Sequence, residues 1–267
     1  EHPGEFFAVM TEAFFEIPPA TYQAAQALAQ KHQATMFMVL EAAYAALLHH
    51  YTEQTDICVG TVVGGRSRPE TLNLVGPFIN PVVLRTKVSA TTSFNDLITR
   101  TRQTCLEAFS NAEAPFEKVV NAVDADRDQS RHPLYQTIFE LQGTPSGGEH
   151  QGLRFSPLLP RLRVSRIELS WLLFPLNGGL FGRIEYASEL FEADSIKRIA
   201  THFSKLLAEA CAAPDRPVGR IRFLDEREDA LDAVQEAMLT LVRRYATRPP
   251  DEWAPLSYRV LESRIAD

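Results

Sequence analysis

The sequence predicts an α+β fold in which a mixed, largely antiparallel sheet is covered by helices. Apolar residues make up 45% and charged residues 23% of the 267 positions, a composition typical of a chain with a packed core. Short runs rich in β-branched and aromatic residues are interspersed with longer segments of helical periodicity. Asn177-Gly178-Gly179 separates two of the short runs, and an Asn-Gly pair in this position indicates an antiparallel hairpin.

Six runs have the composition of strands, and Pro18-Pro19 ends the first of them. They are Ala13–Ile17, Ile57–Val63, Ile79–Val83, Leu134–Leu141, Ile167–Phe174 and Leu180–Tyr186. The connection after Val63 contains Gly64, Gly65 and Gly76, and glycine permits backbone conformations and close approaches that a side chain would forbid. Thr144–Gln151 has the composition of a loop.

Five segments are expected to be helical. They are Ala20–Gln33, Met36–Tyr51, a segment that begins at Phe94, a shorter one that begins at Pro115, and Asp194–Ala212. Thr35 and Ser93 occupy N-cap positions, where a hydroxyl accepts a hydrogen bond from a free backbone N–H. Apolar residues surround Met36–Tyr51, which predicts a buried helix, and form one stripe on Asp194–Ala212. In the helix after Ser93, the residues expected to face the core are Phe94, Leu97, Ile98, Cys105 and Phe109.

Charge and cysteine content exclude several classes of protein. A net charge of -7 argues against a nucleic-acid partner, which would require a basic surface. Cys58, Cys105 and Cys211 are far apart and lie in apolar runs, so we expect buried thiols and neither zinc nor disulfides. The longest apolar run is too short to cross a bilayer, so no membrane partner is expected. The chain has no initiator Met and no signal-like start, and we expect a cytoplasmic piece of a longer protein.

Seven short patterns follow one another between residues 13 and 224. They are Thr35–Tyr44 (TMFMVLEAAY), Gly60–Arg66 (GTVVGGR), Val75–Arg85 (VGPFINPVVLR), Ala114–Glu117 (APFE), Arg127–Gln136 (RDQSRHPLYQ), Arg166–Leu169 (RIEL) and Gly182–Phe191 (GRIEYASELF). Together they resemble the condensation domain of nonribosomal peptide synthetases, which carries TlfmvLlAay, GtpvaGR, vGxFvNTlxlR, hqdxPFE, RdxsrnPLfq, kfDL and GxieYatdLFd in this order. The resemblance covers the carboxy-terminal lobe of that two-lobed domain.

The character of the sequence changes beyond Leu224, and we place a linker or domain boundary near 225–230. Thr247–Asp251 (TRPPD) and Leu256–Leu261 (LSYRVL) resemble the opening of an adenylation domain, rtPd followed by LtYreLnera. The expected organisation is therefore a condensation-domain lobe over 1–224, and a linker with the beginning of an adenylation domain over 225–267.

The resemblance implies a lobe similar in fold to chloramphenicol acetyltransferase, with the reaction centre in a tunnel between two lobes. It implies an acyltransferase that forms an amide bond between a carrier-bound acyl or peptidyl thioester and a carrier-bound aminoacyl thioester. 4′-Phosphopantetheine would be delivered by carrier domains, and no cofactor would be bound directly by this chain. The implied partners are peptidyl carrier domains, the missing amino-terminal lobe and the adjoining adenylation domain.

The catalytic motif of the family, HHxxxDG, is absent from the 267 residues, so no catalytic residue is assigned and the chain alone is expected to be inactive. The second His of that motif suits proton transfer because an imidazole titrates near working pH. His49-His50 is not this motif, because Gln54 and Thr55 replace the Asp and Gly and the pair ends a helix. A structural role is also expected for His132, and His202 is expected on the surface of its helix.

Asn80, Arg85, Gly76, Gly65 and Arg66 are the candidate residues of the tunnel wall and lobe interface. The resemblance implies that Asn80 hydrogen-bonds within the tunnel and that Arg85 pairs with the Asp of HHxxxDG. A strand-end Asn and a solvated Arg are the alternative for these two. Two alternatives are also open for the loop Gly60–Arg66: the side chain of Arg66 anchors it, or backbone geometry alone determines its shape. Pro81 replaces the family's Thr and removes a hydroxyl and a backbone donor.

The sequence is also compatible with two other functions. Condensation-like domains also include non-catalytic modules that recruit a tailoring partner, and related members esterify or cyclise their substrates. An intact HHxxxDG upstream of Glu1 would favour catalysis, and a degenerate one would favour the interaction module.

Overall fold

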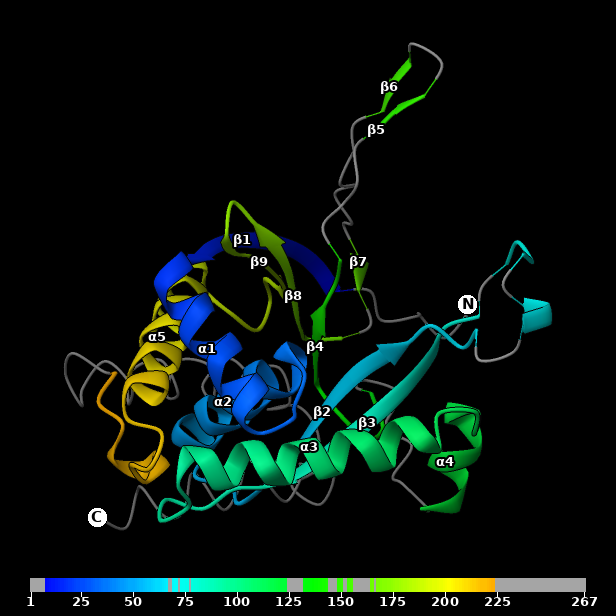
Figure 1. Ribbon diagram of the computed structural model, residues 1–267. Helices are drawn as coiled ribbons and strands as arrows, with labels where there is room; N and C mark the ends of the chain where they lie inside the picture. The colour runs from blue at the N-terminus through cyan, green and yellow to red at the C-terminus, as the bar shows by residue number, and fades with distance from the viewer. Residues whose placement is uncertain are drawn as a thin grey trace.

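The computed structural model describes residues 8–66, 69–71, 73–76, 78–123, 132–143, 148–150, 153–155, 164–165 and 167–223 (Figure 1). The strands are β1 (Ala8–Ile17), β2 (Asp56–Val63), β3 (Asn80–Lys87), β4 (Thr137–Leu141), β5 (Gly148–His150), β6 (Leu153–Phe155), β7 (Val164–Ser165), β8 (Leu169–Leu176) and β9 (Gly179–Ala187). The helices are α1 (Pro19–Lys31), α2 (Met36–Thr52), α3 (Phe94–Ser110), α4 (Phe116–Ala122) and α5 (Ala193–Ala212), with 3₁₀ turns η1 (Pro69–Thr71) and η2 (Val218–Arg220).

One seven-stranded sheet has the strand order β3-β2-β4-β8-β9-β1-β7. The pairs β2–β4 and β4–β8 are parallel, and the other neighbouring pairs are antiparallel. The predicted α+β class with a mixed, largely antiparallel sheet is therefore confirmed. The strands β5 and β6 form a separate antiparallel pair. The expected loop Thr144–Gln151 is thus wrong for Gly148–His150, which form strand β5.

Helices α1, α2, α3 and α5 lie on one face of the sheet (Figure 1). Successive side chains of a strand point to opposite faces, and the inward set here is apolar. Trp171 of β8 is buried and lies 5.1 Å from the ring of Tyr44 on α2 and 5.2 Å from the ring of Phe203 on α5, measured between centroids. These rings join two helices to the centre of the sheet, so the core forms on this face.

The helix starts follow from their caps. The Thr35 hydroxyl accepts a hydrogen bond from the Met38 N–H at 3.3 Å, and the Ser93 hydroxyl accepts one from the Asp96 N–H at 3.1 Å. Both predicted N-caps are confirmed. The central residues of α2 are buried all round, as its apolar composition predicts. Asn177 and Gly178 both have positive φ, 51° and 79°, which gives the predicted tight hairpin between β8 and β9.

Several local predictions are wrong in detail. The first strand begins at Ala8 instead of Ala13 because its early residues pair with β9 and β7. The strand expected from Leu134 begins at Thr137. Phe109 is 36% exposed near the end of α3, while His202 is 4% exposed and not on the surface. His202 is buried because the Tyr51 hydroxyl hydrogen-bonds its Nδ1 and the Phe223 ring packs beside it.

Cys105 is buried, whereas Cys58 and Cys211 are half-buried, so the expectation of buried thiols holds for one of the three. Burial raises the pKa of Cys105 and of Cys211 to about 12 and also raises that of Cys58. No group of metal-ligating side chains occurs among the described residues. No helix in this part of the chain has the length and apolarity needed to cross a membrane.

Some sequence predictions lie outside the described residues. They are the solvated loop Asp124–Arg131, the boundary near 225–230 and the tail that resembles an adenylation domain.

Candidate functional site

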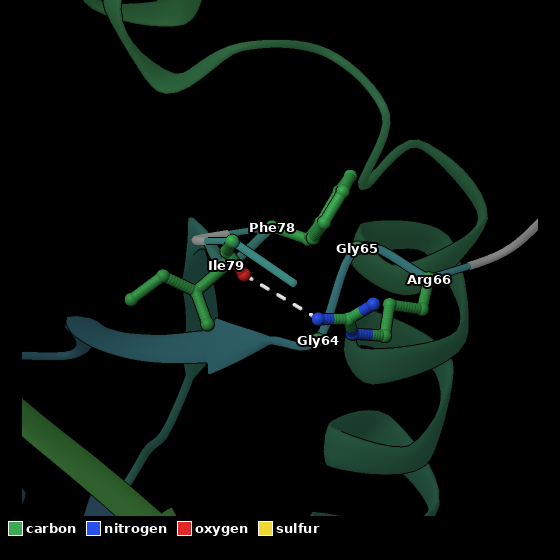
Figure 2. A pocket seen from close by; sticks show the side chains of 6 residues that line it. Gly64, Gly65, Arg66, Phe78 and Ile79 are labelled. Carbon is green, nitrogen blue, oxygen red and sulfur yellow. Dashed lines mark hydrogen bonds between the residues drawn. The ribbon is translucent and has the colours of Figure 1, made fainter. Parts of the chain in front are cut away.

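The connection between β2 and β3 surrounds an open hollow of about 570 Å³. The two strands pair from Asp56 with Lys87 to Val63 with Asn80, so the connection leaves and returns at the same end of the ladder. Figure 2 shows the residues that line the hollow, which are Gly64, Gly65, Arg66, Gly76, Phe78 and Ile79. Three candidate residues from the sequence, Gly65, Arg66 and Gly76, are therefore brought together.

Arg66 holds this connection from within. Its Nη1 donates to the carbonyl oxygens of Thr71 and, at 2.7 Å, Leu74. Its Nη2 donates to the carbonyl oxygen of Gly76 at 3.4 Å, the dashed line in Figure 2. The guanidinium carbon also lies 4.4 Å from the centre of the Phe78 ring, within the range of a cation–π contact. A single side chain thus fixes carbonyls from three places in the connection.

Gly65 is required by the backbone of the connection. Its φ is +57°, a region that side chains disfavour, and a Cβ atom here would collide with the carbonyl oxygen of Phe78. Gly76 has a φ of +158°, which side chains also disfavour, although a Cβ there would make an ordinary 3.6 Å contact with the Phe78 ring. Gly65 is therefore required by both space and backbone conformation, and Gly76 by backbone conformation alone.

Asn80 binds the turn between α3 and α4. Its Nδ2 donates to the carbonyl oxygens of Ala112 at 2.9 Å and Ala114 at 2.8 Å, and its Oδ1 accepts from the Phe116 N–H at 3.3 Å. The amide thus satisfies two carbonyls and one N–H near the start of α4. This bracing of the turn could not be anticipated from sequence, because the partners lie more than 30 residues away.

Arg85 is paired within the lobe. Its Nη2 lies 2.6 Å from Oδ2 of Asp56, and its Nε donates to both carboxylate oxygens at 2.9 and 3.1 Å. The hydrogen bond from Arg85 lowers the pKa of Asp56 and raises the pKa of Arg85. Arg85 faces Cys58 across the β2–β3 ladder, so Asp56, two residues earlier, is its diagonal neighbour on one face. Sequence reasoning missed Asp56, although this register would have identified it.

The candidate residues do not form one site. Asn80 and Arg85 are five positions apart on one strand, so their side chains point to opposite faces of the sheet. Pro81 is accommodated because β3 is an edge strand that pairs only with β2, so the missing N–H of Pro81 cannot disrupt pairing with a further strand. The structure therefore places Asn80 at the base of the loop, and Arg85 apart from the hollow.

The histidines near these elements have structural contacts. His49 Nδ1 lies 2.6 Å from the Gln54 carbonyl oxygen, and His50 Nε2 lies 2.8 Å from that of Val218, both at the end of α2. His132 stacks on Tyr135 at 3.9 Å between ring centroids, and burial lowers its pKa to about 4. None of these three has the geometry of the HHxxxDG motif, in keeping with the structural roles predicted for them.

The sequence matches the Condensation domain family over residues 7–231. It is 33% identical over 255 residues to surfactin synthase subunit 1 of Bacillus subtilis strain 168, covering 89% of this chain and 7% of that protein. It is 34% identical over 215 residues to bacitracin synthase 3 of Bacillus licheniformis, covering 80% of this chain and 3% of that protein. The chain thus spans a small part of the curated relatives it matches.

Solved structures with the same fold include a four-domain nonribosomal peptide synthetase bound to AMP and glycine, with a TM-score of 0.76 and 20% identity over 82% of this chain and 18% of that one. The first condensation domain of the calcium-dependent antibiotic synthetase matches with a TM-score of 0.69 and 19% identity, over 83% of this chain and 49% of that one. The fold expected from the resemblance is therefore confirmed, and this chain belongs to the condensation domain family.

Proposed function

We propose that this chain is the carboxy-terminal lobe of a condensation domain that joins two carrier-bound substrates. The amine of an aminoacyl thioester attacks the carbonyl carbon of an acyl or peptidyl thioester, a C–N bond forms, and the C–S bond to the donor's pantetheine thiol breaks. The observation that carries this proposal is the family match over residues 7–231, supported by identities above 30% to peptide synthases. Both substrates would arrive on 4′-phosphopantetheine arms of peptidyl carrier domains.

The lobe would supply one wall of the tunnel and no proton-transferring group. The 267 residues contain no HHxxxDG, so the general base would come from the amino-terminal lobe. Arg66 and Gly65 would keep the β2–β3 connection in one shape against the tunnel, and Asn80 would fix the turn before α4 behind it. On its own, the chain would be inactive. The tail beyond residue 225 would lead into an adenylation domain.

Arg85 would contribute to the contact between lobes. Its side chain is 69% exposed, and its hydrogen bonds within the described residues use Nε and Nη2. The Nη1 group is therefore free to receive a second carboxylate, such as the Asp of HHxxxDG. An arginine offers five N–H donors in a planar fork, so one guanidinium can serve two carboxylates. Asp56 would then hold the fork in place for the incoming Asp.

The test compares this chain with the complete domain, extended upstream through the HHxxxDG motif. Each is mixed with two carrier proteins loaded with an acyl and an aminoacyl group, and the amide product is measured by mass spectrometry. We expect product from the complete domain, none from the 267-residue chain, and none after the second His of the motif is changed to Ala. Product from the chain alone, or none from the complete domain, would contradict the proposal.

A non-catalytic module is the second candidate. One solved structure of this fold is an X-domain in complex with OxyB from teicoplanin biosynthesis, with a TM-score of 0.72 and 24% identity. If this chain recruits a tailoring protein in the same way, the upstream motif will be degenerate and the complete domain will bind such a partner without forming an amide. An ester or a cyclised product in the carrier assay would instead identify a related catalytic subtype.

A further inference from the structure

Gly64 borders the hollow, and no contact requires a glycine there. A Cβ atom at Gly64 would meet no heavy atom within 4 Å, and its φ does not lie in the left-handed region. The next residue, Gly65, has the opposite character, with a positive φ and a backbone oxygen in the place of a side chain. The backbone conformation therefore does not require glycine at position 64, and the absence of a side chain there leaves space in the hollow.

The lining of the hollow favours an apolar group. The guanidinium of Arg66 is the one cation among the six lining residues, and it donates to three backbone carbonyls while covering the Phe78 ring. Three of its five N–H groups are therefore already engaged with backbone carbonyls, and the rest of the lining is glycine and apolar side chains. The side chain of Ile79 is 68% exposed, and Phe78 is half-buried, so apolar surface is available for contact.

We propose that the hollow takes the apolar side chain or acyl chain of a thioester-bound substrate, and that Gly64 sets the size of the group admitted. The inference rests on the function proposed above and adds a specificity-determining residue to it. A methyl group at Gly64 would occupy part of the space beside it, so glycine leaves room for a group larger by about one methyl.

Binding to the 267-residue chain tests the proposal without any reaction. The probes are acetyl, hexanoyl and succinyl thioesters of N-acetylcysteamine, and their affinities are measured by ligand-observed NMR titration. Each buried methylene of the probe raises the affinity about fourfold, but an open hollow buries only part of the acyl chain. We therefore expect the hexanoyl probe to bind about tenfold more tightly than the acetyl probe. The succinyl probe, which ends in a carboxylate, should bind no better than acetyl.

The matched variants are Gly64→Val and Gly143→Val. Both glycines lie in open space, but Gly143 does not line the hollow, so Gly143→Val should leave all affinities unchanged. Gly64→Val should weaken hexanoyl binding about tenfold and acetyl binding less than twofold. Ile79→Asp, which places a charge on the lining, should weaken hexanoyl binding without filling the space. Circular dichroism melting confirms that each variant is folded.

Equal affinities for the three probes, no binding of hexanoyl, or a Gly64→Val chain that binds like the unchanged chain would each overturn the proposal. These results are separable from the proposed function. If the complete domain forms amide while Gly64→Val has no effect on binding, the assignment of the hollow alone is wrong. If binding depends on size as expected while the complete domain forms no amide, the proposed function alone is wrong.

Discussion

Arg85 on the edge strand β3 is joined to Asp56 of β2 by a two-pronged ion pair, with Nη2 2.6 Å from Oδ2 and Nε 2.9 Å from Oδ1. The side chain of Arg85 is 69% exposed and that of Asp56 is 38% exposed. Water therefore screens much of the attraction, and the pair orients the guanidinium more than it stabilises the fold.

Changing Arg85→Ala should raise the pKa of Asp56 toward its ordinary value, because the hydrogen bond from the guanidinium lowers it now. The paired Asp56 contributes stability that is present above its unfolded pKa and is lost as pH falls through its lower folded pKa. The loss in free energy of unfolding at neutral pH should be only about 0.5 kcal/mol. NMR titration of the Asp56 carboxyl checks this, with Lys87→Ala, a weaker neighbouring charge, as the control.

Changing Asn80→Ala should loosen the turn before α4, because the carbonyls of Ala112 and Ala114 lose their donor. Part of the turn is exposed and water replaces some of the lost bonds, so the cost should be about 1–2 kcal/mol in free energy of unfolding. Urea denaturation measures the cost, and hydrogen exchange should show faster exchange at the Phe116 N–H. Gln103→Ala, which removes an exposed side-chain bond on α3, should have no such effect.

Changing Gly65→Ala should distort the β2–β3 connection, because the methyl group would collide with the Phe78 carbonyl at a backbone φ of +57°. We expect a loss of about 1–3 kcal/mol and altered amide chemical shifts from Gly64 to Ile79. Gly64→Ala is the matched control and should leave both the melting temperature and these shifts nearly unchanged. Equal effects at the two glycines would contradict the conformation described for this connection.

Glu41 should make the free energy of unfolding depend on pH between about pH 5 and pH 8. It is fully buried in α2, neither carboxylate oxygen has a hydrogen-bond partner among the described residues, and burial raises its pKa well above the ordinary value. A raised folded pKa gives stability that is complete below the unfolded pKa of about 4.3 and is lost as pH rises through the folded pKa.

Glu41→Leu should therefore stabilise the chain at pH 8 by at least about 2 kcal/mol and flatten the dependence between pH 5 and pH 8. Urea denaturation at the two pH values provides the measurement. Glu107→Gln, an exposed acid on α3, should change neither quantity. If Glu41→Leu leaves the pH dependence of the free energy of unfolding unchanged, the buried carboxyl is ionised and its charge is balanced by other groups.

Changing Tyr44→Phe should cost about 1–3 kcal/mol, because it leaves the hydroxyl of Thr137 without its buried partner at 2.6 Å. Thr137→Val should have a cost of similar size for the same reason. The double variant should be less destabilised than the sum of the two, since no polar group is then left unpaired. Guanidinium denaturation of all four chains completes the cycle, and simple additivity would argue against the bond.

Local signals account for the elements that sequence could predict. Thr35 and Ser93 mark helix starts because a hydroxyl cap acts within three residues, and Asn177-Gly178 marks a hairpin because its turn needs two positive φ values. Contacts between distant segments account for the errors. The burial of His202 depends on Tyr51 and on Phe223, and neither is its neighbour in sequence.

In the candidate site, too, the local features could be predicted from sequence and the contacts between distant segments could not. The glycines and Arg66 belong to one short segment, so their proximity could be expected from sequence. The bond of Asn80 to the α3–α4 turn and the pairing of Arg85 with Asp56 depend on tertiary packing and strand register, which sequence alone leaves undetermined. Gly64 stands out from the neighbouring glycines only in the structure, which shows the empty space beside it.

The pairing of β1 with β9 has a consequence for synthesis of the protein. β1 leaves the ribosome before the other described strands, yet its ladder runs to Ala187 of β9, the last of them to appear. Until then its apolar residues Phe14 and Phe15 have no sheet to join, while α2 and the β2–β3 ladder can already assemble from nearby residues. β1 therefore stays unpaired while the other described strands are synthesised, which makes it a target for a chaperone that binds extended apolar peptides.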